Sequence, residues 1–161
     1  EVDVLKLQYD NQEKIAPRPG CFELLEQLKQ HGYRCWLLTN ADQASLQLKL
    51  ENIDLSPYFE VMLSSEEIGY SKEFVEFWEI LQQKHDFDPQ YAMMIDDTEK
   101  VLQGAEKFGI TQLITIVQPS SGRAARQAHD LNYPAIQNLT ELLPLIETSI
   151  TLQKEFNVKT A

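Results

Sequence analysis

Two adjacent carboxylates, Asp96 and Asp97, follow a short apolar run that begins at Tyr91. The run has no helical period, so it predicts a strand that is buried on both faces of a sheet. Neighbouring carboxylates repel each other, and a hard divalent cation such as Mg²⁺ takes carboxylate oxygens as its ligands in proteins. The stretch therefore predicts a metal site, with the alternative that Asp97 or Thr98 only caps the next helix.

Lys72 is a second candidate, because the sequence places it at the predicted start of a helix. The helix dipole is positive there, so a lysine at this position is slightly unfavourable. A lysine at such a position indicates a task, such as neutralising a bound phosphate group. The alternative interpretation is a solvated surface lysine.

Helical and extended patterns alternate along the chain. Apolar spacing and end signals predict helices at residues 21–31, 43–50, 72–81, 101–108, 124–129 and 139–146. Short apolar runs predict strands at residues 33–38, 60–63, 91–95 and 112–117, with a loop at residues 66–71. This alternation predicts an α/β fold, in which a mostly parallel sheet carries helices on both faces.

Polar residues follow each of the predicted strands. The four groups are Thr39-Asn40, Ser64-Ser65, Asp96-Asp97 and Gln118 through Ser121. Parallel strands joined by crossover helices place their carboxyl ends along one edge of the sheet, where α/β proteins bind their ligands. Together the groups predict a site for phosphate and a metal ion at that edge.

The composition narrows the class of protein. A chain of 161 residues with 43% hydrophobic residues fits one globular domain. Fourteen Lys and Arg against 25 Asp and Glu give a net charge of −11, which opposes binding to nucleic acid or to an anionic membrane. No apolar stretch approaches the roughly 18 residues of a membrane span. Cys21 and Cys35 lie in apolar patterns and indicate buried thiols, which predicts a reducing, cytoplasmic location.

Three stretches in this order resemble motifs II, III and IV of the haloacid dehalogenase (HAD) superfamily of hydrolases: Leu37-Leu38-Thr39-Asn40, Gly69-Tyr70-Ser71-Lys72-Glu73 and Met94-Ile95-Asp96-Asp97-Thr98. The longer stretches TNAD, LSSEEIGYSKE and MIDDTEKVLQGAEKFGI resemble the GMP/IMP 5′-nucleotidase branch. The resemblance extends from Ala16 to Ile146 and implies a Rossmann-like core.

The resemblance also implies roles for single residues. Thr39 would hydrogen-bond the phosphate through its hydroxyl group, with the backbone amide of Asn40 beside it. Lys72 would neutralise the charge of the phosphate and of the nucleophile. Asp97 would coordinate Mg²⁺ directly, and Asp96 would do so directly or through water. These roles agree with the chemistry of the residues, since a hydroxyl group and a cation suit phosphate and carboxylates suit a metal ion.

The family's first motif is not found. It is an apolar strand that ends in Asp-x-Asp, whose first Asp attacks phosphorus and whose second is the general acid and base. The closest candidate, Val2-Asp3-Val4-Leu5, lacks the second acidic residue. We therefore expect a HAD core whose first, central strand is missing. Residues 1–15 would be a remnant of the cap domain, residues 16–146 the core and residues 147–161 a tail.

A core without its central strand leaves a gap between the strands that end at Thr39 and Asp97. Residues 2–9 could fill the gap, although Asp3, Lys6 and Gln8 suit a buried central strand poorly. A second copy of the chain could fill it by self-association, or the core could rearrange.

The resemblance implies a Mg²⁺-dependent phosphohydrolase, a 5′-nucleotidase that acts on purine nucleoside monophosphates such as GMP or IMP. The chain begins with Glu1 rather than Met and lacks the nucleophile motif, so we expect a truncated form that is inactive alone. Two alternatives remain open at this point. One is a catalytically dead HAD-like domain that binds phosphate, metal or a partner chain, and the other is a structural domain without a ligand.

Overall fold

The computed structural model describes residues 2–3, 8–10, 14–118 and 124–148. Its centre is a six-stranded parallel sheet with the strand order β5-β4-β1-β6-β7-β8. The strands of this sheet are β1 (Val2–Asp3), β4 (Cys35–Thr39), β5 (Val61–Ser64), β6 (Met93–Asp96), β7 (Gln112–Ile116) and β8 (Ala135–Ile136). Two further strands, β2 (Gln8–Asp10) and β3 (Lys14–Ala16), form a separate antiparallel pair.

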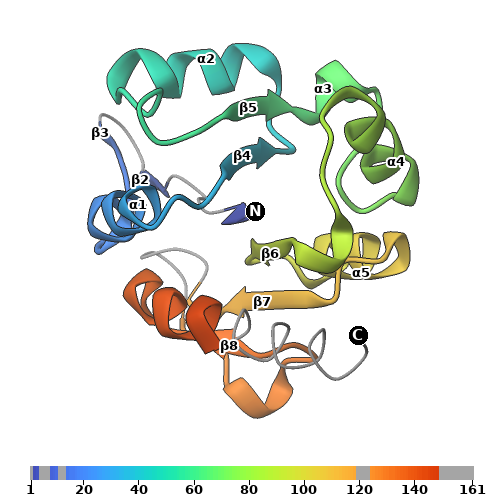
Figure 1. Ribbon diagram of the computed structural model, residues 1–161. Coiled ribbons are helices and arrows are strands. Elements are labelled where there is room, and N and C mark those ends of the chain that lie inside the picture. The colour runs from blue at the N-terminus through green and yellow to red at the C-terminus, as the bar shows by residue number, and fades with distance from the viewer. Residues whose placement is uncertain (1, 4–7, 11–13, 119–123, 149–161) are drawn as a thin grey trace.

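Helices connect the parallel strands and cover the sheet (Figure 1). The α-helices are α1 (Cys21–Gln30), α2 (Gln43–Asn52), α3 (Ser65–Ile68), α4 (Val75–Lys84) and α5 (Glu99–Phe108). Three 3₁₀-helices are η1 (Pro89–Tyr91), η2 (Ala128–Asp130) and η3 (Leu139–Glu141), and residues 142–148 are again α-helical. The predicted α/β fold, a mostly parallel sheet with helices on both faces, is confirmed.

The sheet separates two hydrophobic cores. Along β4, Cys35 and Leu37 pack with α1, α2 and the last helix, whereas Trp36 and Leu38 pack with α4 and α5. This is the period of two expected when successive side chains of a strand point to opposite faces. The prediction of strands buried on both faces is therefore confirmed, and Figure 1 shows α1 and α5 on opposite sides of the sheet.

The place of the central strand is filled, which corrects the prediction of a missing strand. The two residues of β1, Val2 and Asp3, pair in parallel with β4 on one side and with β6 on the other. Of the alternatives considered, the chain's own N-terminal segment occupies the gap, so no second copy is needed to supply a strand. Asp3 pairs with Trp36 and Met94, so the described part of β1 ends short of its neighbours.

Three other predictions need correction. Helix α4 begins at Val75 rather than at Lys72, and Phe74, which falls inside the predicted helix, is its N-cap residue and is 57% exposed. Lys72 therefore precedes the helix, and the dipole argument does not apply to it. The predicted loop at 66–71 contains the short helix α3, and the helix predicted at 124–129 is a 3₁₀ turn that begins at Ala128.

No helix in the described ranges is both long and apolar enough to cross a membrane.

Candidate functional site

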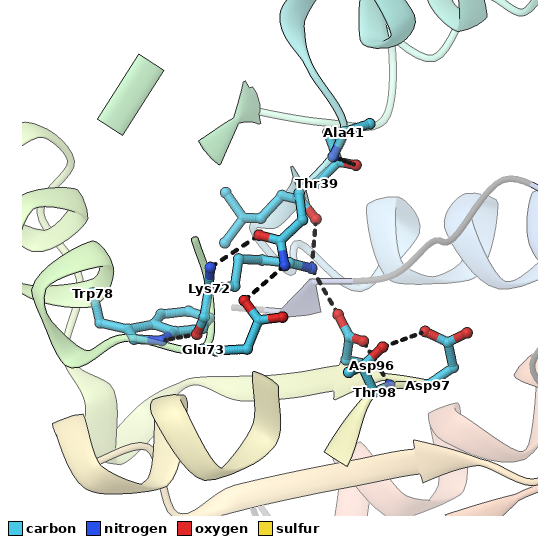
Figure 2. A network of polar contacts seen from close by, with 10 residues as sticks. Thr39, Ala41, Lys72, Glu73, Trp78, Asp96, Asp97 and Thr98 are labelled. Atoms are coloured by element: carbon cyan, nitrogen blue, oxygen red, sulfur yellow. Dashed lines mark hydrogen bonds and ion pairs between the residues drawn. The ribbon is translucent and has the colours of Figure 1, made fainter. Parts of the chain in front are cut away.

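Four of the predicted site residues lie at one edge of the sheet, where the parallel strands end. Thr39 ends β4 and is in register with Ser64 of β5, while Asp96 ends β6 and is in register with Thr115 of β7. Lys72 reaches this edge from the loop before α4. Figure 2 shows Thr39, Lys72, Asp96 and Asp97 close together.

A buried ion pair lies at the centre of this group. The Nζ atom of Lys72 donates a hydrogen bond to Oδ2 of Asp96 at 2.6 Å and another to the carbonyl oxygen of Leu38 at 2.9 Å. Lys72 is 5% exposed and Asp96 is 9% exposed. The interpretation of Lys72 as a solvated surface lysine is therefore wrong. Charged groups removed from water in this way must be paired, because an isolated buried charge is costly.

The second oxygen of Asp96 is also engaged, since Oδ1 accepts a hydrogen bond from the backbone N–H of Thr98 at 2.8 Å. Asp97 is as buried as Asp96, and its Oδ1 lies 3.4 Å from the Thr98 hydroxyl. Thr98 is the N-cap residue of α5, but its side chain makes no capping hydrogen bond. Thr98 therefore does not serve as the side-chain cap that the alternative interpretation proposed.

The carboxylates have the right donor chemistry for Mg²⁺, which binds oxygen ligands. Both oxygens of Asp96 already accept hydrogen bonds from the protein. In the part of the chain that is described, no cluster of three or more His, Cys, Asp or Glu side chains could hold a metal ion. Asp96 and Asp97 bring the oxygen type that Mg²⁺ takes, and a coordination shell built on them would need water or ligand oxygens as well.

Asn40 ties the Lys72 loop to the end of β4. Its side-chain Oδ1 accepts a hydrogen bond from the backbone N–H of Lys72 at 2.9 Å, and its Nδ2 donates to Oε2 of Glu73 at 2.9 Å. Burial opposes ionisation of Glu73, but hydrogen bonds from Ser71 and Asn40 and the charge of Lys72 outweigh it and lower the pKa of that carboxyl group. The resemblance implied a role for the Asn40 backbone amide only, so the bridging side chain is an addition from the structure.

Two residues that the sequence did not indicate, Trp78 and Gly104, lie against the backbone of Lys72. The indole Nε1 of Trp78 donates to the carbonyl oxygen of Lys72 at 2.9 Å. A Cβ atom on Gly104 of α5 would lie 2.6 Å from the carbonyl oxygens of both Lys72 and Glu73. The glycine thus lets the loop pack directly on the helix backbone. Its one sequence signal is a glycine inside a helical pattern, which often marks a close approach.

The remaining strand-end groups have other roles. The Ser64 side chain donates to the carbonyl oxygen of Ala41 at 2.6 Å and caps α3, so it is a structural residue. The hydroxyl oxygen of Thr39 accepts a hydrogen bond from the backbone N–H of Ala41 at 3.1 Å. Gln118 lies at the end of the described segment, and residues 119–121 of the predicted group lie outside the described residues.

Arg18 is a further charged residue near the site. It precedes α1, is 9% exposed and lies in the electrostatic field of Asp97. Burial lowers the pKa of the Arg18 guanidinium group, and the Asp97 carboxylate opposes that shift. Sequence pattern offers no signal for Arg18, because its neighbours Pro17, Pro19 and Gly20 are typical of a stiff connection between elements.

Replacing Asn40 with alanine is expected to lower the free energy of unfolding by about 1–2 kcal/mol, because two hydrogen bonds are lost and the Lys72 amide loses its acceptor. Urea denaturation measures the change. Asn52→Ala is a matched control, since Asn52 is exposed at the end of α2 and is expected to change stability by less than about 0.5 kcal/mol. Equal effects of the two substitutions would show that Asn40 does not hold the loop.

Comparison with known proteins identifies the family of this chain. The family model for haloacid dehalogenase-like hydrolases matches residues 4–115, and the chain belongs to this family. Its predicted resemblance to the HAD superfamily is thereby confirmed.

Two relatives within this family have named activities. The GMP/IMP nucleotidase YrfG of Escherichia coli (strain K12) is 29% identical over 143 residues, which cover 89% of this chain and 64% of the relative. The pyrophosphatase PpaX of Bacillus mycoides (strain KBAB4) is 22% identical over 125 residues, which cover 78% of this chain and 57% of the relative. This chain thus spans less than two thirds of the length of either protein.

Solved structures share the fold. The crystal structure of a putative β-phosphoglucomutase from Thermotoga maritima has a TM-score of 0.67 and 21% identity, covering 82% of this chain and 60% of its own. The HAD-hydrolase YfnB from Bacillus subtilis, whose structure is described as bound to magnesium, has a TM-score of 0.65 and 20% identity. The match covers 81% of this chain and 56% of YfnB.

Proposed function

We propose that this chain carries the phosphate- and Mg²⁺-binding part of a phosphohydrolase that acts on purine nucleoside monophosphates. The observation that carries the proposal is the buried Lys72–Asp96 ion pair, which lies at the strand-end edge together with Thr39 and Asp97. A buried cation, a hydroxyl group and two carboxylates at one sheet edge suit a phosphate group and a divalent ion.

Each residue either contacts the phosphate group or positions a residue that does. The Lys72 ammonium group offsets the charge of the phosphate oxygens, and Asp96 holds that ammonium group in place. The Thr39 hydroxyl group donates a hydrogen bond to a phosphate oxygen. The same hydroxyl oxygen still accepts the hydrogen bond from the backbone N–H of Ala41. The backbone amide of Asn40 adds a second donor, and the Asn40 side chain fixes the loop that carries Lys72.

Asp97 and Asp96 would hold Mg²⁺, with Asp97 in direct contact because both oxygens of Asp96 are engaged by Lys72 and Thr98. When bound, Mg²⁺ supplies charge stabilisation for the phosphoryl oxygens.

We further propose that the 161 residues alone do not turn over substrate. The last described residue of β1, Asp3, pairs with Met94, two residues before Asp96. At about 3.3 Å per residue, the Asp3 backbone lies about 7 Å below the edge where Asp96 and Asp97 lie. A nucleophilic carboxylate is needed at that edge. The same observation favours a second candidate function, a HAD-like domain that binds phosphate and Mg²⁺ without catalysis.

The substrate class is proposed from the E. coli relative, which is named a GMP/IMP nucleotidase and is 29% identical. A cytoplasmic location is proposed as well. Cys21 and Cys35 are buried free thiols, and burial raises the pKa of Cys21 to about 12, which suits an inert thiol in a reducing compartment.

Adding Mg²⁺ is expected to raise the melting temperature, because an ion that binds only the folded chain stabilises it by mass action. Asp97→Asn is expected to abolish this rise. Asp130→Asn is a control at an exposed aspartate of η2 and should leave the rise intact. A thermal shift with Mg²⁺ from micromolar to millimolar concentration makes the measurement. If Mg²⁺ raises the melting temperature of Asp97→Asn as much as that of the wild type, Asp97 is not a ligand of the ion.

A turnover assay with GMP and Mg²⁺ separates an active chain from a binding domain. The expected result is no phosphate release above the uncatalysed rate. Sustained Mg²⁺-dependent release from the purified chain would show that a carboxylate of this chain does reach the edge.

A further inference from the structure

Glu73 is a carboxylate that the proposed reaction does not use, although it lies beside Lys72 in the contact network of the phosphate edge (Figure 2). Its Oε2 atom accepts a hydrogen bond from the side-chain Nδ2 group of Asn40 at 2.9 Å. The charge of Lys72 acts on this carboxylate, so the carboxylate in turn weakens the attraction of Lys72 for an anion. A negative charge at this place lowers phosphate affinity unless the group has another task there.

The side-chain amide of Asn40 has two ends that are not interchangeable. Its Oδ1 atom accepts a hydrogen bond from the backbone N–H of Lys72 at 2.9 Å, and its Nδ2 group donates to Glu73. Although burial opposes ionisation, hydrogen bonds and the nearby charge of Lys72 lower the pKa of the Glu73 carboxyl group, so it remains an acceptor. If the amide turned over, donor would face donor and acceptor would face acceptor, and both hydrogen bonds would be lost. Glu73 thereby selects the orientation in which Asn40 holds Lys72.

The backbone that carries Glu73 is fixed by contacts of its own. A Cβ atom on Gly104 would lie 2.6 Å from the carbonyl oxygens of Lys72 and Glu73, so this backbone packs directly against α5. The indole Nε1 of Trp78 donates to the Lys72 carbonyl oxygen at 2.9 Å. Asn40, in contrast, is an exposed residue that follows the end of β4. Glu73 is therefore the fixed partner of the pair, and Asn40 is the side chain that it orients.

The orientation of Asn40 matters because it joins two donors of the proposed phosphate site. One donor is the backbone N–H of Asn40, and the other is the ammonium group of Lys72, which lies 32 residues further along the chain. An anion that accepts hydrogen bonds from both needs the two donors at a fixed separation, and donors that are held in place before binding are the most effective. The hydrogen bonds from Glu73 through Asn40 to Lys72 supply that fixed separation.

We propose that Glu73 is a positioning residue of the phosphate site, which orients the Asn40 side chain and so sets the spacing of the Asn40 and Lys72 donors. This role rests on the proposed function and adds to it a residue that acts without touching the substrate. Two properties of Glu73 then have opposite effects on phosphate affinity. Its charge lowers the affinity, and its hydrogen-bond acceptor raises it.

Two substitutions at Glu73 remove the same charge and separate these effects. Glu73→Gln keeps an acceptor oxygen for Asn40, so phosphate affinity is expected to equal that of the wild type or to exceed it by up to about 3-fold. Glu73→Ala also removes the acceptor, so affinity is expected to fall about 5-fold below the wild type. Inorganic phosphate is titrated into the full chain at saturating Mg²⁺, at a temperature where every variant is folded.

Glu66 provides the matched control. It is an exposed glutamate that lines the same surface pocket as Asn40, and its carboxylate accepts a hydrogen bond from the backbone N–H of Gln43. Glu66→Gln and Glu66→Ala are expected to bind phosphate with affinities within about 2-fold of each other, because neither changes the orientation of Asn40. Should Glu73→Ala fail to fold, Glu73→Asp keeps the charge, withdraws the acceptor by one methylene group and is expected to weaken binding as well.

The outcomes separate this role from the proposed function. Phosphate binding by the wild type with equal affinities in Glu73→Gln and Glu73→Ala would overturn the positioning role and leave the phosphate site standing. A higher affinity in both variants would also overturn it, since Glu73 would then act through its charge alone. If the wild type binds no phosphate, the proposed function fails, and hydrogen exchange of the Lys72 backbone N–H still tests the contact. That N–H is expected to exchange at least about 5-fold faster in Glu73→Ala than in Glu73→Gln, and equal exchange would show that Glu73 does not orient Asn40.

Discussion

Replacing Lys72 with methionine is expected to lower the free energy of unfolding by about 3–5 kcal/mol, the cost of leaving a buried charge without its partner. Asp96 is 9% exposed, and its Oδ2 lies 2.6 Å from the Lys72 ammonium nitrogen. Methionine fills much of the same volume but donates no hydrogen bond, so the carboxylate and the Leu38 carbonyl group both lose a donor.

Urea denaturation of four proteins tests this expectation: the wild type, Lys72→Met, Asp96→Asn and the double variant. The double variant is expected to be more stable than Lys72→Met, because the uncompensated charge is removed. Lys84→Met is the matched control at an exposed lysine of α4. If Lys72→Met and Lys84→Met both cost less than about 1 kcal/mol, the ion pair is not buried in solution and the proposed site loses its centre.

Replacing Gly104 with alanine is expected to destabilise the protein by about 1–3 kcal/mol, the usual cost of overpacking a filled core. In an open helix the same change would stabilise by roughly 0.5–1 kcal/mol, because alanine is the better helix former. At Gly104 the added Cβ would lie 2.6 Å from two backbone carbonyl oxygens, those of Lys72 and Glu73. Backbone atoms cannot rotate away, so the loop that carries Lys72 must move.

The sign of the Gly104→Ala effect in thermal and urea denaturation is therefore diagnostic. Gln103→Ala, at the exposed neighbouring position of α5, is the control and should change stability by less than about 0.5 kcal/mol. A gain in stability for Gly104→Ala would mean that the Lys72 loop does not rest on α5. A loss accompanied by weaker phosphate binding would link the packing of the loop to the site.

The sequence predicts those parts of the site that depend on local pattern. The apolar run into Asp96 and Asp97 predicts β6 and its polar end, and the structure buries all four residues of that strand. Asp42 is the N-cap of α2, a position where aspartate is among the preferred residues, and its side chain accepts a hydrogen bond from the Ser45 N–H. Alternation of strands and helices then gives a parallel sheet, whose geometry alone brings Thr39 and Asp96 to one edge.

Features that depend on contacts between residues far apart in the sequence cannot be predicted from local pattern. The helix that becomes α4 is predicted, with Phe77, Trp78 and Leu81 inside it and buried, but the predicted helix begins about one turn too early and includes Lys72. What holds Lys72 is a set of contacts with Asp96, Asn40 and Leu38, none of which is its neighbour in sequence.

The central strand β1 also could not be predicted from local pattern. The polar residue Asp3 argues against a buried strand, yet two parallel ladders hold Val2 and Asp3 between β4 and β6. The low strand propensity of a single residue such as aspartate is outweighed by hydrogen-bonded pairing with a neighbouring strand on each side. Arg18 illustrates the converse case, because a charged residue in a Pro- and Gly-rich connection is only 9% exposed.

Binding of inorganic phosphate in the presence of Mg²⁺ tests the proposed phosphate site at Thr39, Lys72 and Asp97, since phosphate is the product of the proposed reaction and its binding needs no nucleophile. Titration followed by ³¹P NMR on the wild type, Thr39→Val and Thr39→Ser makes the comparison. We expect Mg²⁺-dependent binding by the wild type, affinity about 10-fold lower in Thr39→Val, where the hydroxyl group is lost, and affinity near the wild type in Thr39→Ser. Absence of phosphate binding at saturating Mg²⁺, or equal affinity in all three proteins, would contradict a phosphate site at this edge.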